Sequence, residues 1–136
     1  MNPLPLSHVA LVIRTDFSDQ QTWEAIGAAI SQPTAEDFRA HVEFVDDDAY
    51  RGLSTEQLLD LLPDSDPRAF FMVVDDITVR EPGNPILVVG PRRDRGRLFR
   101  AIPAAVQSIE NNLSISNMDF AEFAGAVDQD GVFRGF

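Results

Sequence analysis

Apolar runs separated by amphipathic segments constrain the fold of this chain more than any other feature of its sequence. The run VALVI within residues 8–15 and the run AFFMVV at residues 69–74 are continuous, which is typical of strands buried on both faces. A third extended segment lies between them at residues 41–45. Helical patterns fill both intervals, so the three segments form two strand–helix–strand units. Such units require parallel strands joined by right-handed crossovers.

Start and stop signals support both intervening helices. Each interval contains a serine followed three residues later by a glutamine, which is the spacing of a capping box: Ser18 with Gln21, and Ser54 with Gln57. Apolar residues then recur at helical spacing, and a proline follows each pattern, at Pro33 and Pro63. The sequence therefore predicts one helix between each pair of strands.

The second half of the chain predicts a hairpin followed by two helices. Residues 86–89 and 98–102 are apolar segments on either side of GPRRDRG, close enough to pair as antiparallel strands. Pro103 suits the first turn of a third helix. Ser116 or Asn117 is the predicted cap of a fourth, shorter helix.

The element order β-α-β-α-β-β-β-α-α predicts a single α/β domain over residues 1–136. Its sheet is mixed, its first three strands are parallel, and its helices pack on the sheet. The last nine residues, DQDGVFRGF, add a turn and a short strand containing Phe133 and Phe136. Aromatic residues at a chain end either fold back as an edge strand or stay free to anchor a partner, and we favour folding back.

Composition narrows the functional classes. The chain has 136 residues, no cysteine and a net charge of −11, so disulfides, thiolate nucleophiles and cysteine-based zinc sites are excluded. No apolar run approaches the ~20 residues of a membrane-spanning helix, and the N-terminus lacks the features of a secretory signal. We therefore expect a cytoplasmic protein. The negative charge repels nucleic acid and anionic membranes and favours a basic protein partner.

An aspartate follows each of the three predicted parallel strands. Asp16 follows the first, Asp46 opens a run of three aspartates after the second, and Asp75 follows the third. The carboxyl ends of parallel strands meet at one end of the sheet, where α/β folds usually bind ligands. Carboxylates suit Mg²⁺ or Mn²⁺, so these residues form a candidate metal site. The alternative is that they cap helices and shape loops, and no other cofactor is indicated.

Five of the eleven arginines fall within GPRRDRGRLFR, residues 90–100. In a hairpin, Arg92, Arg93 and Arg95 lie near the tip. Together with Arg14 at the end of the first strand, they are candidates to contact an anion such as phosphate, which arginine binds in a bidentate manner. We favour a second interpretation, in which these arginines pair with the chain's own carboxylates, each exposed pair being worth about 0–1 kcal/mol.

The two histidines, His8 and His41, each open a predicted strand. Neighbouring strands would bring the two rings together at the end of the sheet opposite the aspartates, where one could serve as a base or metal ligand. We favour the simpler interpretation that each ring hydrogen-bonds to backbone. The sequence contains none of the motifs GxGxxG, GxxxxGK or GxSxG.

Three segments carry a family resemblance: ALVIRTDFSDQQTW at residues 10–23, HVEFVDDDAYRGLSTEQLL at residues 41–59 and ENNLSISNMDFAEFAGAVDQDGVFRGF at residues 110–136. All three resemble an uncharacterised actinobacterial family of short acidic proteins, a domain-of-unknown-function family. The resemblance spans nearly the whole chain. It implies a bacterial, cytoplasmic protein without an established activity, and it supplies no catalytic residues.

Three functional hypotheses follow. The first is a non-enzymatic acidic binding or regulatory protein, comparable to small inhibitors and immunity proteins, that uses charge to attract a basic partner. The second is a small enzyme dependent on Mg²⁺ or Mn²⁺ that acts on a phosphate-bearing substrate at Asp16, Asp46 and Asp75. The third is a nucleic-acid mimic, which the arginine-rich segment disfavours. The sequence leaves the oligomeric state open.

Overall fold

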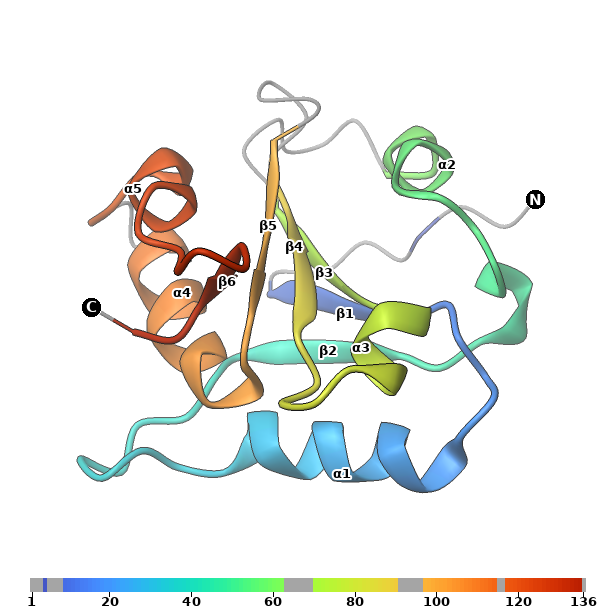
Figure 1. Cartoon of the computed structure of the whole chain (residues 1–136), viewed down its shortest axis with the longest axis horizontal. Coiled ribbons are helices and arrows are strands. Elements are labelled where there is room, and N and C mark those ends of the chain that lie inside the picture. Colours follow the sequence, from blue (N-terminus) through green and yellow to red (C-terminus); the bar gives the residue numbers. More distant parts are fainter. Residues whose placement is uncertain (1–3, 5–8, 63–69, 91–96, 115–116, 136) are drawn as a thin grey trace.

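Six strands form one mixed sheet in the order β2-β1-β3-β4-β5-β6 (Figure 1). The computed structural model describes residues 4, 9–62, 70–90, 97–114 and 117–135. Within these residues the strands are β1 (Ala10–Arg14), β2 (Val42–Val45), β3 (Phe71–Val74), β4 (Ile86–Val89), β5 (Leu98–Ala101) and β6 (Val132–Phe133). The strands β2, β1 and β3 are mutually parallel, whereas β3, β4 and β5 are antiparallel neighbours. The predicted fold class is therefore confirmed.

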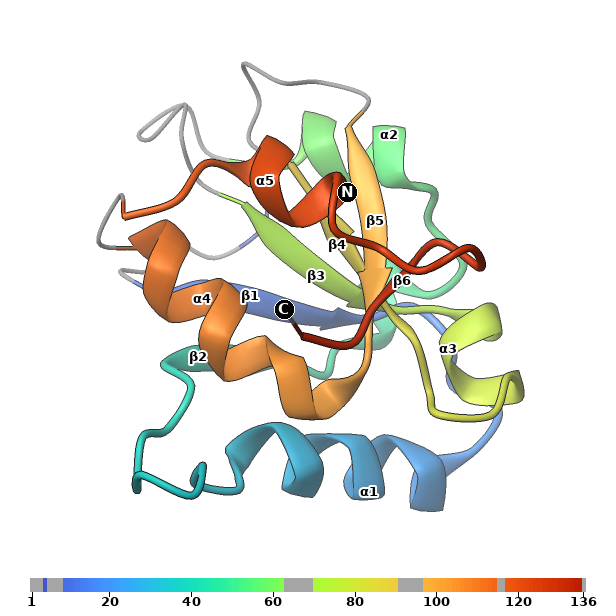
Figure 2. The ribbon, with the colours of Figure 1, turned by 60° about the vertical axis from the view of Figure 1, so that its left-hand side comes forward.

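Helices cover both faces of this sheet. The α-helices are α1 (Gln20–Ser31), α2 (Thr55–Asp60), α3 (Asp76–Arg80), α4 (Val106–Ser114) and α5 (Phe120–Ala124), and the 3-10 helices are η1 (Asp48–Tyr50) and η3 (Pro103–Ala105). As predicted, a helix follows β1 and another precedes β3, and Pro103 opens the turn that leads into α4. Figure 2 shows α4 and α5 over one face of the sheet, with α2 beyond it.

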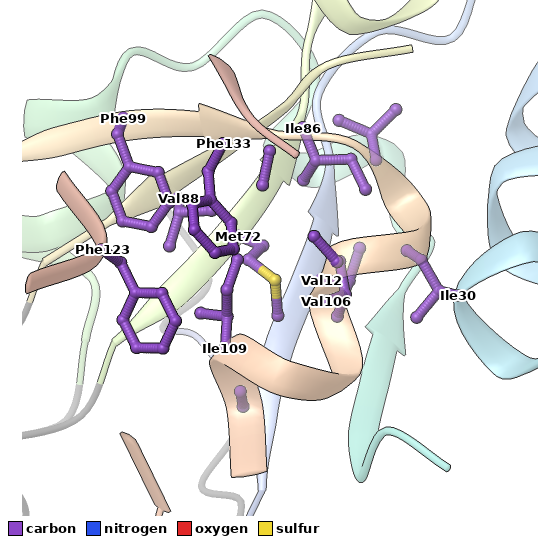
Figure 3. Packing of buried hydrophobic residues seen from close by; sticks show 14 of the residues in the cluster. Val12, Ile30, Met72, Ile86, Val88, Phe99, Val106, Ile109, Phe123 and Phe133 are labelled. Atoms are coloured by element: carbon purple, nitrogen blue, oxygen red, sulfur yellow. The ribbon is translucent and has the colours of Figure 1, made fainter. Parts of the chain in front are cut away.

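A hydrophobic core lies on each face because successive strand residues point in opposite directions. In β1, Ala10 and Val12 join a cluster with residues of α1, α4 and α5, part of which is drawn in Figure 3. Leu11 and Ile13 join a second cluster that contains Leu58 and Leu59 of α2 as well as Tyr50. Because both sides of β1 are covered, its apolar run is continuous rather than alternating.

The predicted helix starts were right for α2 and one or more residues too early for α1 and α5. Ser54 caps α2 with a complete capping box. Helix α1 instead begins after Asp19, whose carboxylate accepts the Thr22 N–H at 3.1 Å, while the Ser18 N–H donates to the Asp16 carboxylate at 2.9 Å. Helix α5 begins after Asp119, not Asn117, and Ser116 lies outside the described residues.

Two further elements refine the predicted order. Helix α3 follows β3 directly and is absent from the predicted order, because five residues are too few to reveal a helical period. Strand β6 pairs in parallel with β5 and confirms that Phe133 folds back. The Phe133 ring is fully buried and lies edge-on to Phe99 and Phe123, as Figure 3 shows. Phe136 lies outside the described residues.

Candidate functional site

The parallel strands β1, β2 and β3 deliver their aspartates to the same end of the sheet. Arg14 is in register with Val74, and Ile13 is in register with Val45, so the three strands stop at the same level. Asp46 and Asp75 directly follow β2 and β3, and Asp16 follows β1 after Thr15. We call this region the acidic end of the sheet, defined by Asp16, Asp46, Asp47, Asp48, Asp75 and Asp76.

Each predicted metal ligand at the acidic end has its own protein partner. The Asp16 carboxylate accepts the Ser18 N–H, the Asp46 carboxylate accepts from Arg14, and the Asp75 carboxylate accepts from Arg100. Across the described residues, no group of three or more histidine, aspartate or glutamate side chains is arranged to hold a metal ion. The acidic end therefore brings several carboxylates to one end of the sheet, but among the described residues they do not converge on one point.

Arg14 is almost completely buried, with 3% of its surface exposed. It occupies the next position after Val12 on the α1 side of β1, so strand alternation carries its side chain under α1. Its Nη1 donates to Gln20 Oε1 at 2.8 Å and to Asp46 Oδ1 at 3.2 Å, and its Nε donates to the Asp16 carbonyl oxygen at 3.2 Å. One guanidinium thus ties together the chain segments that leave β1 and β2.

Aromatic rings enclose the same guanidinium. The Arg14 Cζ lies 4.4 Å from the centroid of the Phe17 ring and 5.3 Å from that of the Trp23 ring. The other contact of Phe17 is with Arg51, whose Cζ lies 4.6 Å from the ring centroid. A cation placed over an aromatic face is attracted by the quadrupole of the ring, so these contacts stabilise the buried charge. An anion could bind Arg14 only by displacing Asp46 from a guanidinium that is almost inaccessible to solvent.

A second arginine, Arg100 of β5, closes the opposite face of the acidic end. Its two Nη atoms bind the two Asp75 oxygens at 2.9 and 2.8 Å, which is a bidentate pair. The buried Thr78 hydroxyl lies 2.9 Å from the same carboxylate and 2.9 Å from the Pro85 carbonyl oxygen. These bonds join the end of β3, helix α3, the start of β4 and the end of β5.

The surroundings of Asp75 hold it in the charged form. Partial burial by itself raises the pKa of the carboxyl group, but hydrogen bonds from Arg100 and Thr78 outweigh it, so that the pKa lies below its ordinary value of 3.8.

Strand alternation explains why Arg14 and Arg100 lie on different faces of the sheet. Asp75 continues the face of Phe71 and Val73, which belong to the α2 cluster, whereas Arg14 lies on the α1 face.

What remains exposed at the acidic end is mostly carboxylate. The Asp46 side chain is 45% exposed even though it binds Arg14. Asp48 and Asp76 are more exposed still, and each has only one long contact with an exposed arginine, at 3.8 Å to Arg51 and 3.8 Å to Arg80 respectively. Such exposed pairs contribute about 0–1 kcal/mol each. The buried arginines are therefore committed internally, and the surface of this end is negative.

Gly90 and Arg97, which stand on either side of Arg92, Arg93 and Arg95 in the sequence, lie at the other end of the sheet, whereas Arg100 of the same arginine-rich segment lies at the acidic end. Arg92, Arg93 and Arg95 lie outside the described residues. The flanking Gly90 donates its N–H to the Arg97 carbonyl oxygen at 3.0 Å, beside Val89, which is in register with Phe71 at the start of β3. Gly90 and Arg97 thus lie a full strand length from Asp75. The predicted contact of Arg14 and this segment with one phosphate stays a prediction, because Arg92, Arg93 and Arg95 are not among the described residues.

Sequence reasoning missed Glu110, the least exposed carboxylate of the described chain at 4%. Its Oε1 accepts the backbone N–H of His41 at 2.7 Å, and its Oε2 accepts the Ser114 hydroxyl at 2.6 Å. The signal was present, because Glu110 stands four residues after Val106 on the apolar side of α4. The hydrogen bond from His41 to Glu110 positions the start of β2.

Of the two histidines, His41 is exposed, and His8 lies outside the described residues.

Residues 9–136 match the family described as a domain of unknown function, DUF6924. The chain belongs to this family. The DUF6924 match covers the three segments, 10–23, 41–59 and 110–136, that carry the resemblance in the sequence. No curated protein matches the chain, and none of the helices described here is long and apolar enough to cross a membrane. Membership of DUF6924 brings no activity with it, so the function has to be argued from the acidic end itself.

Proposed function

We propose that this chain is a non-enzymatic binding or regulatory protein whose acidic end attracts a basic protein partner, in the manner of small inhibitor and immunity proteins. The observation that supports the proposal is that the two least exposed arginines at this end already have carboxylate partners within the chain. Arg14 and Arg100 are held by Asp46 and Asp75, whereas Asp47, Asp48 and Asp76 remain exposed. A surface built in this way attracts cations.

The charge of the whole chain acts in the same direction. A net charge of −11 gives a long-range field that speeds the approach of a positively charged partner and slows that of nucleic acid. Such steering weakens with salt because the Debye length falls from about 10 Å at 0.1 M to about 3 Å at 1 M. The proposed setting is the cytoplasm of an actinobacterium, which rests on the sequence resemblance and on the cysteine-free composition.

The competing hypothesis is an enzyme that uses Mg²⁺ or Mn²⁺ at Asp16, Asp46 and Asp75. A thermal-shift series separates the two hypotheses. A metal held at this site at one hundred times its dissociation constant would add about 2.7 kcal/mol to the free energy of unfolding. We expect no stabilisation by either ion, and stabilisation that disappears in Asp46→Ala would favour the enzyme.

Affinity capture tests the proposal directly. The immobilised chain is exposed to host lysate at about 50 mM and at about 500 mM salt, and the retained proteins are identified and then titrated in purified form. We expect a basic protein that binds only at low salt. The double variant Asp48→Asn with Asp76→Asn should bind it more weakly than the control Glu24→Gln with Glu56→Gln, which changes the net charge equally on α1 and α2.

Equal weakening by the two double variants would mean that only the total charge matters. Retention of an acidic or neutral protein, or binding that does not change with salt, would contradict the proposal.

A further inference from the structure

Strand β2 forms one lateral margin of the sheet. Its neighbour on the inner side is β1, and no strand of the described residues pairs with its outer side (Figure 1). The register from Val42 to Val45 against β1 advances one residue at a time, so β2 carries no bulge. Edge strands are usually protected against pairing by shortness, charged side chains, proline or a bulge. The four-residue strand VEFV has no proline and no bulge, and its one charged residue is Glu43.

The side chains of β2 are unusually open for a strand of an α/β sheet. Glu43 is exposed and Phe44 is 36% exposed. The Phe44 and Trp23 rings form a T-shaped pair with their centroids 6.0 Å apart, so Phe44 packs on α1 while part of the residue stays exposed. An additional strand laid beside β2 would cover apolar surface as well as backbone.

A fixed turn presents another aromatic residue just before β2. Three hydrogen bonds hold it: Thr34 N–H to the Phe38 carbonyl oxygen at 2.8 Å, Asp37 N–H to the Thr34 carbonyl oxygen at 2.9 Å, and Phe38 N–H to Thr34 Oγ1 at 3.1 Å. Phe38 is 59% exposed. Three residues lie between it and Val42, so it lies within about 14 Å of the strand. Exposed aromatic residues on a rigid support are the usual anchors of an interface.

Charge decides which occupant this margin accepts. Glu43 lies within β2 and the exposed carboxylates Asp46, Asp47 and Asp48 continue from it. A second copy of the chain would bring the same carboxylates and a further charge of −11, so like-charge repulsion opposes self-pairing. A strand rich in arginine or lysine would meet opposite charge at Glu43 and at the carboxylates that follow β2.

We propose that β2 accepts an extended basic segment of the partner protein as a seventh strand, with main-chain hydrogen bonds supplying affinity and the carboxylates supplying selectivity. This inference rests on the proposed function and adds the location and the mode of binding. It differs from attraction to the acidic end alone because it requires backbone N–H groups in the ligand.

The test uses two synthetic peptides with the same charge. The first is an eight-residue peptide of alternating arginine and valine, and the second is its counterpart methylated on every backbone nitrogen. Binding to the full chain is measured by calorimetry at low salt. We expect the methylated peptide to bind at least about tenfold more weakly, because it cannot donate to the strand margin. Amide hydrogen exchange of residues 42–45 should slow when the first peptide binds.

Charge-reversal variants provide the matched control. Glu43→Lys should weaken binding of the first peptide about tenfold, and Glu24→Lys on α1, which changes the net charge equally, should weaken it much less. Equal affinity for the two peptides, or protection of the acidic end without residues 42–45, would overturn strand addition while leaving attraction to a basic partner intact. Failure of both peptides to bind, or dimers in which residues 42–45 are protected, would overturn both.

Discussion

Removing the Asp46 carboxylate leaves the Arg14 guanidinium buried without its charge partner. We therefore expect Asp46→Ala to destabilise the chain more than Arg14→Met does, although Asp46 is the more exposed of the two residues. The side-chain exposures are 3% for Arg14 and 45% for Asp46. In Arg14→Met the orphaned carboxylate is already in contact with water, and methionine can fill the space beside Phe17 and Trp23.

The magnitudes follow from the partners that remain. In Asp46→Ala the guanidinium keeps Gln20 and the Asp16 carbonyl, both neutral acceptors. Breaking a fully buried pair costs about 3–5 kcal/mol, and a charged hydrogen bond contributes about 1.5–3 kcal/mol. Because Asp46 is half exposed, water can enter the vacated site. We therefore expect a loss near the lower end of the range for a charged hydrogen bond, about 2 kcal/mol. We expect about 1 kcal/mol for Arg14→Met.

Thermal unfolding gives the assay. An entropy of about 2.1 cal/mol/K per residue over the chain's 136 residues is about 0.29 kcal/mol/K. The expected decreases in Tm are then about 7 °C for Asp46→Ala and about 3 °C for Arg14→Met. The control is Asp48→Ala, which removes an exposed carboxylate 3.8 Å from Arg51 and should lower Tm by less than about 2 °C. If Arg14→Met proves as harmful as Asp46→Ala, or if Asp46→Ala behaves like the control, the reasoning is wrong.

Three further predictions concern the Arg100 network and the C-terminal strand. Asp75→Asn should lower the free energy of unfolding by about 2–3 kcal/mol at pH 7, measured by urea denaturation. Because the pKa of Asp75 is depressed in the folded state, its stabilisation is present above its unfolded-state pKa of about 4 and is lost as the pH falls, so wild type and Asp75→Asn should converge toward pH 2. Thr78→Val removes the buried hydroxyl that bonds to Pro85 and Asp75 and should cost about 1–3 kcal/mol at neutral pH; only part of this cost should disappear in acid, the part that the hydroxyl contributes to lowering the Asp75 pKa. Phe133→Ala should cost about 3–5 kcal/mol and loosen β6, which faster amide exchange at the C-terminus would report; an unchanged stability would mean that β6 contributes nothing to the core.

The order and direction of the central strands could be predicted because their signals are local and strong. The continuous apolar run at residues 69–74 predicted a strand that is buried on both faces. The capping box at Ser54 predicted a helix between that strand and the strand before it. The start of α1 was predicted one residue early because Ser18 and Asp19 are both good caps. The Asp16 carboxylate engages Ser18 and leaves Asp19 to cap the helix.

The acidic end was predicted only in part. Its aspartates could be placed together because parallel strands share their exits. Their partners could not, because Arg14 pairs with Asp46 across 32 residues of sequence and Arg100 pairs with Asp75 across 25. No local pattern encodes such pairs. The position of Arg14 nevertheless contained a hint, since an arginine two residues beyond Val12 lies on a face that a helix covers.

Trp23 is the only tryptophan of the chain, and it contacts both Phe44 of β2 and the Arg14 guanidinium. The protein therefore contains an intrinsic fluorophore that contacts both the edge strand β2 and the buried arginine of the Arg14–Asp46 pair. A ligand that settles on the strand margin, or a change that releases the guanidinium, alters the surroundings of this single indole. Its emission spectrum can be followed during a titration without attaching any label.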